Sequence, residues 1–237
     1  MTKYLIIIIG LISSLGCKDK ESVITIVDIG HLDRNGIAQQ LTIINKYSPK
    51  VVGLDFLLTT DSLLKDIPLS QALSKLKNVV ESSKLHNKDE GSIDKWDSLE
   101  RYHPKFRFNN HGFSNITIDD DSVIVSELPM RQYYGNQPVY AFSYMVAKMY
   151  NDGHVNSKYE NSNQDIDFAK GVIGRYFKII SIKDLMAENF DKKDFTEKIV
   201  LMGHVSDKED SFYLDEKRTK RISGVEIQAS FINAILN

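Results

Sequence analysis

The chain has 237 residues, of which 42% are hydrophobic and 26% charged, and its formal net charge is −2. This composition is typical of a folded protein and excludes a wholly disordered chain, while the lack of a basic surplus argues against nucleic acid as a partner. A single cysteine excludes a disulfide framework and a cysteine-rich metal site.

The start of the chain is typical of a secretory signal peptide. A positively charged beginning precedes apolar residues 4–16, a stretch too short to cross a membrane as a helix. Cys17 follows directly, and this junction resembles the lipobox of bacterial lipoproteins, although Ser14 stands where that motif prefers Leu. The resemblance implies that residues 1–16 are removed, that Cys17 is lipidated and that residues 17–21 form a tether. The alternatives are an uncleaved membrane anchor, simple secretion and a buried strand.

The next sixty residues alternate between strand and helix patterns. Short β-branched apolar runs predict three strands, at residues 22–29, 51–58 and 78–81. Apolar residues at helical spacing predict two helices, one over 35–47 capped by Asn35 and one over 69–76 with Pro68 in its first turn. Alternation of this kind predicts βαβ units and a parallel sheet.

The second half of the chain is less regular. A polar stretch over 86–110 predicts a long loop, and β-prone runs on both sides of Asp119–Asp121 predict an antiparallel hairpin, because this acidic turn lacks the ligand spacing of a calcium loop. The remaining predicted elements are a helix from Pro138 to Met149, a loop over 151–167, a strand at 177–180, a short helix capped by Ser181, a strand at 198–202 and a helix at 224–236. The sequence thus predicts an α/β fold, a mainly parallel sheet with helices on both faces plus an antiparallel hairpin, in one domain over 22–237.

Four stretches carry a family pattern in a fixed order. They are Ile26–Asp28, Lys50–Phe56, Gly112–Pro129, and Lys198–Gly203 followed by Gly224–Ala229. Together they resemble the CHASE domain of type two, an extracytoplasmic sensory module of bacterial receptors. The resemblance extends over about residues 22–236, nearly the whole chain after the N-terminal segment. It implies a ligand-sensing domain of a membrane-tethered protein that acts in signal transduction.

The sequence departs from this family pattern at several places. His204–Ser206 stand where small residues are usual, Gln228 replaces a histidine, and a Thr-Pro pair is missing between Asp207 and Ser223. If these positions shape a ligand site, we expect this chain to have lost its ligand or to bind an altered one. Family members usually continue into membrane helices and a cytoplasmic output domain, whereas this sequence ends at Asn237. We therefore expect a separate signalling partner, the alternative being a truncated receptor that lacks its output domain.

Polar side chains follow the predicted strands at the points where these strands end. Asp28 and Asp55 close consecutive strands, His204 follows the last strand, and Asp207 lies in the loop after it. Because the carboxyl ends of parallel strands meet at one edge and consecutive strands are often neighbours, we expect these four side chains to bind a ligand in a polar pocket. A cationic or polar ligand and a divalent ion both suit such a set. The alternative is that both aspartates accept hydrogen bonds from loop amides.

Motifs of common enzyme classes are missing from the sequence. There is no GxSxG, HExxH, GxxxxGK[ST] or GxGxxG pattern. We therefore expect a non-catalytic domain without a cofactor, which recognises an unknown small molecule or protein. The alternative from another class is a metal-dependent hydrolase that uses Asp28, Asp55 and His204.

Overall fold

The computed structural model describes most of the chain after its N-terminal segment. The described residues are 22–62, 66–87, 96–116, 127–159, 165–167, 177–213 and 221–237. The expected signal peptide, Cys17 and the acidic turn at Asp119–Asp121 lie outside these ranges.

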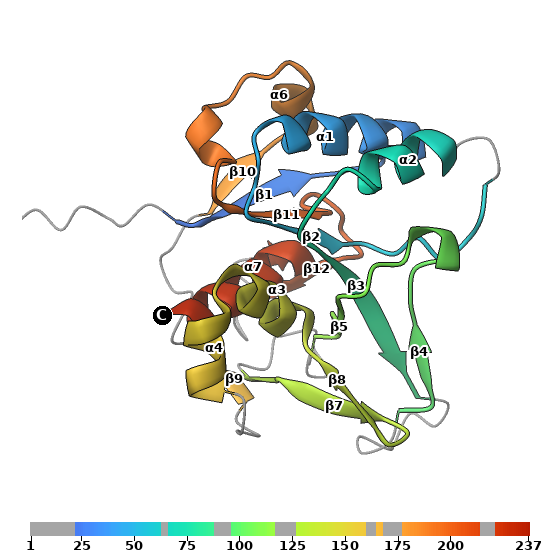
Figure 1. Ribbon diagram of the computed structural model, residues 1–237, viewed down its shortest axis with the longest axis vertical. Helices are drawn as coiled ribbons and strands as arrows, with labels where there is room; N and C mark the ends of the chain where they lie inside the picture. Colours follow the sequence, from blue (N-terminus) through green and yellow to red (C-terminus); the bar gives the residue numbers. More distant parts are fainter. Residues whose placement is uncertain are drawn as a thin grey trace, which may run out of the picture.

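A central sheet of seven strands organises the molecule (Figure 1). Its strands lie in the order β10-β1-β11-β2-β3-β4, and β5 pairs with β3. Their bounds are Ile24–Asp28 (β1), Val51–Asp55 (β2), Val79–His86 (β3), Ser98–Glu100 (β4), His111–Phe113 (β5), Lys178–Ile180 (β10) and Ile199–Gly203 (β11). All pairings are parallel except that of β4 with β3. The prediction of a mainly parallel sheet is confirmed.

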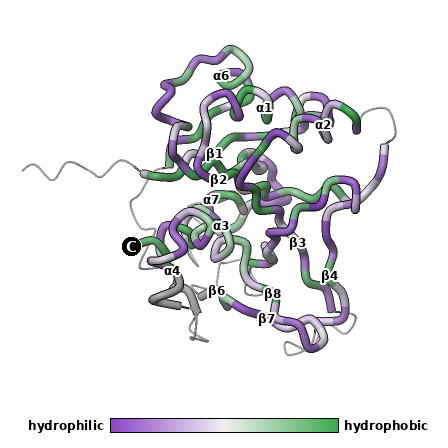
Figure 2. Tube along the Cα trace, in the orientation of Figure 1, coloured by the Kyte–Doolittle hydropathy of each residue, from purple (hydrophilic) through white to green (hydrophobic). Residues whose placement is uncertain are grey.

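The β-branched runs form the middle of the sheet because both of its faces are covered. Ile199, Val200 and Leu201 of β11 are fully buried, as expected of a strand between two layers of helices. Figure 2 shows the most hydrophobic segments in these central strands and in the helix beneath them.

Helices cover both faces, as the sequence predicts. The helices α1 (Arg34–Lys46), α2 (Asp66–Leu73) and α6 (Ile182–Met186) lie on one face, and α3 (Phe142–Tyr150) and α7 (Gly224–Leu236) lie on the other (Figure 1). Each face has its own cluster of buried side chains, with Leu41 and Leu69 in one and Phe142 and Phe231 in the other. The sheet therefore separates two hydrophobic cores.

The first helix begins two residues earlier than the sequence predicts. Its cap is Asp33, whose side chain accepts a hydrogen bond from the amide of Gly36 at 3.1 Å. Asn35 lies within the helix, so the prediction of an Asn35 cap is wrong. Both residue types are good caps, and the choice depends on where the loop after β1 turns.

Shorter elements complete the fold. They are the hairpin of β7 (Arg131–Tyr134) and β8 (Gln137–Tyr140), the pair β12 (Ser211–Tyr213) and β13 (Arg221–Ser223), the pair β6 (Glu127–Pro129) and β9 (Asp165–Asp167), the helix α4 (Asp152–Tyr159), and the 3₁₀ turns η1 (Pro104–Phe106) and η2 (Lys192–Asp194). All three strand pairs are antiparallel.

Three sequence predictions for this region are wrong. Pro138 lies in β8 opposite Tyr133 and does not open a helix, since a two-stranded hairpin tolerates a missing amide donor. The expected loop over 86–110 contains β4 and η1, and the expected loop over 151–167 contains α4 and β9. Polar composition misled the interpretation, because these elements lie at the outside of the fold.

Candidate functional site

The carboxyl edge of the sheet places Asp28 and Asp55 farther apart than the sequence suggests. The last strand, β11, lies between β1 and β2, so that Gly203 is the register partner of both Asp28 and Asp55. Two strand spacings, about 10 Å, therefore separate their backbones. The expectation that consecutive strands would make these two residues direct neighbours is wrong.

Asp28 and Asp207 are both engaged by backbone amides. The Oδ1 atom of Asp28 accepts hydrogen bonds from the amides of Gly30 at 3.0 Å and Val205 at 3.2 Å. The Oδ1 atom of Asp207 accepts one from the amide of Glu209 at 2.9 Å. In both residues the carboxylate organises the loop that follows a strand.

Asp55 and His204 line a pocket of about 850 Å³ at this edge. Loops from both sides of the sheet surround it. Its polar and charged lining residues include Arg34, Asp55, Thr60, Ser62, Ser82, Lys84, Ser114, Asn115, His204 and Asp210, and its apolar ones include Ile29, Leu32, Ile37, Leu57, Leu58, Ile116 and Phe212. This volume suits a small organic molecule.

Asp55 and Asp210 are the two acids inside the pocket whose charges act on each other. Burial raises the pKa of Asp55 to about 8, with the negative charge of Asp210 adding to the effect and the ammonium of Lys84 opposing it. Burial also raises the pKa of Asp210, which His204 and Lys84 lower and Asp207 raises. At neutral pH Asp55 is therefore mostly a neutral carboxylic acid.

The position of Asp210 depends on the beginning of α7. Its carbonyl accepts a hydrogen bond from the amide of Gly224 at 3.0 Å. A Cβ atom on Gly224 would lie 2.6 Å from Oδ1 of Asp210, so this carboxylate packs directly against the glycine. The absence of a side chain at residue 224 thus gives Asp210 its place in the pocket.

The ionisable side chains of the pocket contrast with buried acids elsewhere. Glu81 binds Arg101 at 3.0 Å and the amide of Phe108 at 2.8 Å. Within the described part of the chain, by contrast, no hydrogen bond or ion pair engages the carboxylates of Asp55 and Asp210. Among the same residues, Nδ1 of His204 is buried without a partner. Among the described residues, the pocket thus holds two carboxylates and one imidazole nitrogen without hydrogen-bond partners.

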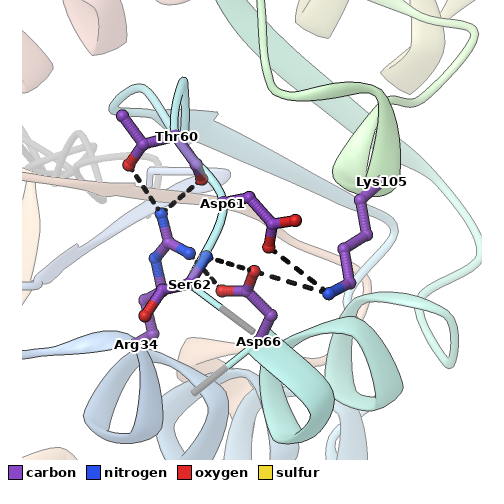
Figure 3. Close-up of polar contacts among 6 residues, drawn as sticks. All are labelled: Arg34, Thr60, Asp61, Ser62, Asp66 and Lys105. Carbon is purple, nitrogen blue, oxygen red and sulfur yellow. Dashed lines mark hydrogen bonds and ion pairs between the residues drawn. The ribbon is translucent and has the colours of Figure 1, made fainter. Parts of the chain in front are cut away.

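A charged cluster fixes one wall of the pocket (Figure 3). Arg34, at the start of α1, donates to Asp66 and to the carbonyl of Thr60, the latter at 2.6 Å. Asp66 is fully buried and also accepts a hydrogen bond from the amide of Ser62 at 2.8 Å. Lys105 of η1 lies 3.5 Å from the same carboxylate. The loop over 56–62 is in this way tied to α1, α2 and η1.

The residues of the hydrolase alternative do not come together at this edge of the sheet. Among the described residues, no group of three or more His, Cys, Asp or Glu side chains could hold a metal ion. Asp28 is turned towards loop amides, so the three residues of the hydrolase alternative do not meet around the cavity.

Of the helices in the ranges covered by the structure, none has the length and hydrophobicity needed to cross a membrane.

Sequence reasoning left two charged residues out of the expected site. Lys84 is an exposed residue in the second half of β3 and lines the pocket. The predicted strand ended at residue 81, so the prediction did not include Lys84. Asp210 lies in the same loop as Asp207 and leaves from the same edge of the sheet, which was the available signal. Only the packing of this loop against α7 distinguishes Asp210, which enters the pocket, from Asp207, which does not line it.

Comparison with known proteins gives a family for the chain. The family model of the CHASE2 domain matches residues 19–237. No curated protein and no solved structure matches the chain. The match includes every element of the central sheet and the loops around the pocket. The chain therefore belongs to the CHASE2 domain family, a family of extracytoplasmic sensory domains.

Proposed function

We propose that the chain is a non-catalytic ligand-sensing domain and that its ligand is a small molecule bound in the pocket that contains Asp55 and His204. The observation that carries this proposal is the cavity itself, which lies at the carboxyl ends of parallel strands and is lined by Asp55, Asp210 and His204, whose side-chain polar groups lack hydrogen-bond partners within the described residues. In open α/β sheets this edge is where ligands bind.

The walls of the pocket supply a means of transmitting the binding event. They come from the loop over 56–62, from the residues that follow β11 and from the beginnings of α1 and α7. A ligand that contacts all of these segments favours one arrangement of them over others. A signalling partner then recognises that arrangement.

A thermal-shift screen tests the proposal. The purified protein is heated with each member of a library of small water-soluble metabolites, and the same hits are measured on Ser114→Trp, which places a large side chain at the pocket wall. We expect compounds that raise the melting temperature of the natural protein and have little effect on this variant. The matched control is Ser206→Trp, because Ser206 is exposed and does not line the pocket.

Two outcomes would contradict a ligand site in this pocket. One is a set of hits that stabilise Ser114→Trp as much as the natural protein. The other is a full library without any stabilising compound, with both tryptophan variants folded.

We further propose that the chain is held at the membrane through a lipid on Cys17 after removal of residues 1–16. This follows from the position of the single cysteine at the end of the apolar segment. Intact-mass measurement of membrane-extracted protein should show the shortened chain with added lipid, and Cys17→Ser should move the protein to the soluble fraction. An unmodified chain that begins at Met1 would refute the anchor.

A further inference from the structure

We propose that the pocket takes a small organic cation, an ammonium or guanidinium compound, whose charged group lies between Asp55 and Asp210, and that its binding releases a proton from the pocket. This inference rests on the proposed function, and it names the chemical class of the ligand that the pocket binds.

The first argument is the set of polar groups that the protein leaves without partners. Both carboxylates lack a hydrogen bond or ion pair within the described residues, and both are largely removed from water. A buried acid in this condition is costly to ionise unless a cation accompanies it. The cationic group of a ligand would remove this cost for both carboxylates.

The second argument concerns the cations already present. Arg34 also lines the pocket, but Asp66 and Thr60 occupy its guanidinium. Lys84 is exposed and acts on both acids only through its charge. Once Asp55 ionises, one exposed ammonium lies opposite two carboxylates, so the pocket is then short of positive charge, which disfavours an anionic ligand.

The third argument is the size and the apolar wall of the cavity. About 850 Å³ is far more than one inorganic ion occupies. Leu32, Leu57, Leu58 and Phe212 supply apolar and aromatic surface beside the charged groups. Such a wall suits the carbon skeleton of an organic cation, and an aromatic ring adds attraction for the cation itself.

The proton balance follows from the state of Asp55. Because its pKa is about 8, some nine tenths of the Asp55 side chains carry a proton at pH 7. A bound cation favours the ionised form, so the proton leaves to solvent and the carboxylate remains paired with the ligand. Asp210 and Lys84 act on Asp55 through their charges, and the charges of Asp55 and Glu81 both act on Tyr102. The other titratable or charged groups that line the same pocket are Asp33, Arg34 and His204.

Three matched probes test the ligand class: benzylammonium, benzyl alcohol and benzoate, which share a ring and differ in charge. Each is titrated into the full-length protein and followed by NMR shifts of pocket residues such as Phe212. We expect benzylammonium to bind in about the millimolar range, as suits eight heavy atoms, and at least tenfold more tightly than either of the other probes. Its affinity should rise by nearly tenfold from pH 6 to pH 7 and level off above pH 8.

Proton release can be measured on the natural protein without any substitution. In weakly buffered solution at pH 7, saturation with benzylammonium should release about 0.9 proton per protein. Asp55→Asn should abolish this release and weaken binding at least tenfold. Asp210→Asn should also weaken binding, and it serves as the second variant if Asp55→Asn does not fold. Glu209→Gln is the matched control, because it removes an exposed charge from the same loop.

The outcomes separate this inference from the proposed function. If benzoate or benzyl alcohol binds the pocket as tightly as benzylammonium, the cation class is wrong and the ligand-sensing pocket stands. If benzylammonium binds without proton release, or if none of the probes binds at 50 mM (roughly ten times the expected dissociation constant), the inference is overturned. The proposed function is then judged separately by the metabolite screen.

Discussion

At the scale of single residues, acids with similar sequence contexts have opposite roles. Asp28 and Asp55 both close a buried strand, yet only Asp28 is satisfied by loop amides. Asp55 has no such partners within the described chain, and burial raises its pKa to about 8. A sequence pattern that treats the two positions alike cannot separate them, because the difference depends on which loops return to each strand end.

Replacing Asp55 with Asn should make the protein more stable at high pH. Its folded-state pKa lies above the ordinary value of 3.8, so the stability of the natural protein falls as the pH rises from about 4 to 8. Asp55→Asn removes this fall, and we expect its free energy of unfolding, relative to the natural protein, to increase by at least about 2 kcal/mol between pH 5 and pH 8. Denaturant unfolding at both pH values measures the difference.

Asp28→Ala provides the comparison for that experiment. Loss of its two amide contacts should lower the stability by about 1–3 kcal/mol at both pH values. An Asp55→Asn variant that loses stability in the same way would mean that Asp55 is a structural hydrogen-bonding residue.

Asp66 illustrates the opposite case of a buried acid with abundant partners. Burial by itself would raise its pKa, but a side-chain hydrogen bond with Asp61, the amide of Ser62 and the guanidinium of Arg34 lower it below the ordinary range. Asp66→Asn should reduce the stability by about 3 kcal/mol at pH 7, because Arg34 keeps its charge and loses its partner. Since the folded-state pKa is lowered, this deficit should shrink as the pH falls below about 4.

Thermal or denaturant unfolding between pH 3 and pH 7 measures this deficit. Asp152→Asn is the control, because Asp152 lies outside this cluster, is 67% exposed and its ion pair with Lys148 is long, at 4.0 Å. This control should cost less than about 1 kcal/mol. Equal losses in both variants would contradict the importance of the buried pair.

At the scale of elements, the sequence is most informative where periodicity is strong. The apolar runs at 51–58 and 198–202 predict β2 and β11, because a strand that is buried on both faces needs a continuous apolar run. The apolar spacing at 224–236 predicts α7, because a helix that packs on a sheet needs one apolar stripe. No local sequence pattern indicates that β11 lies between β1 and β2, because this position depends on contacts between segments some 150 residues apart in the chain. The separation of Asp28 from Asp55 was unpredictable for this reason, and so was the entry of Lys84 into the pocket.

Close packing of β5 against α3 gives a prediction at this scale. A Cβ atom on Gly112 would lie 2.6 Å from the backbone nitrogen and Cα of Phe142, where little can move. Gly112→Ala should therefore lower the free energy of unfolding by about 2–3 kcal/mol in denaturant titrations. Gly153→Ala in α4 has no atom within 4 Å of the new methyl group and should stabilise the protein by about 0.5–1 kcal/mol. Similar effects of the two substitutions would contradict this packing.

At the scale of the whole molecule, one sheet separates two hydrophobic cores and is buried most deeply at its centre. Leu201 in β11 is fully buried, whereas Ile179 in β10 is 39% exposed at the edge of the sheet. Neither core is complete without the central strands, so both cores should be lost together when the molecule unfolds.

Native-state hydrogen exchange should follow this order. We expect the backbone amides of β1, β11 and β2 to exchange at least about 100-fold more slowly than those of β4 and β10, because only global unfolding exposes the central strands. Exchange monitored by NMR or by mass spectrometry of peptides measures these rates. Comparable protection of β10 and β11 would show that opening does not begin at the edges.

The place of β11 between β1 and β2 also affects how the chain is made. The strands β1 and β2 leave the ribosome about 170 and 140 residues before β11, their shared neighbour, a delay on the order of ten seconds at usual synthesis rates. During that time the nascent chain cannot close its central sheet. The strand order of this domain therefore delays completion of the central sheet until almost all of the chain has been synthesised.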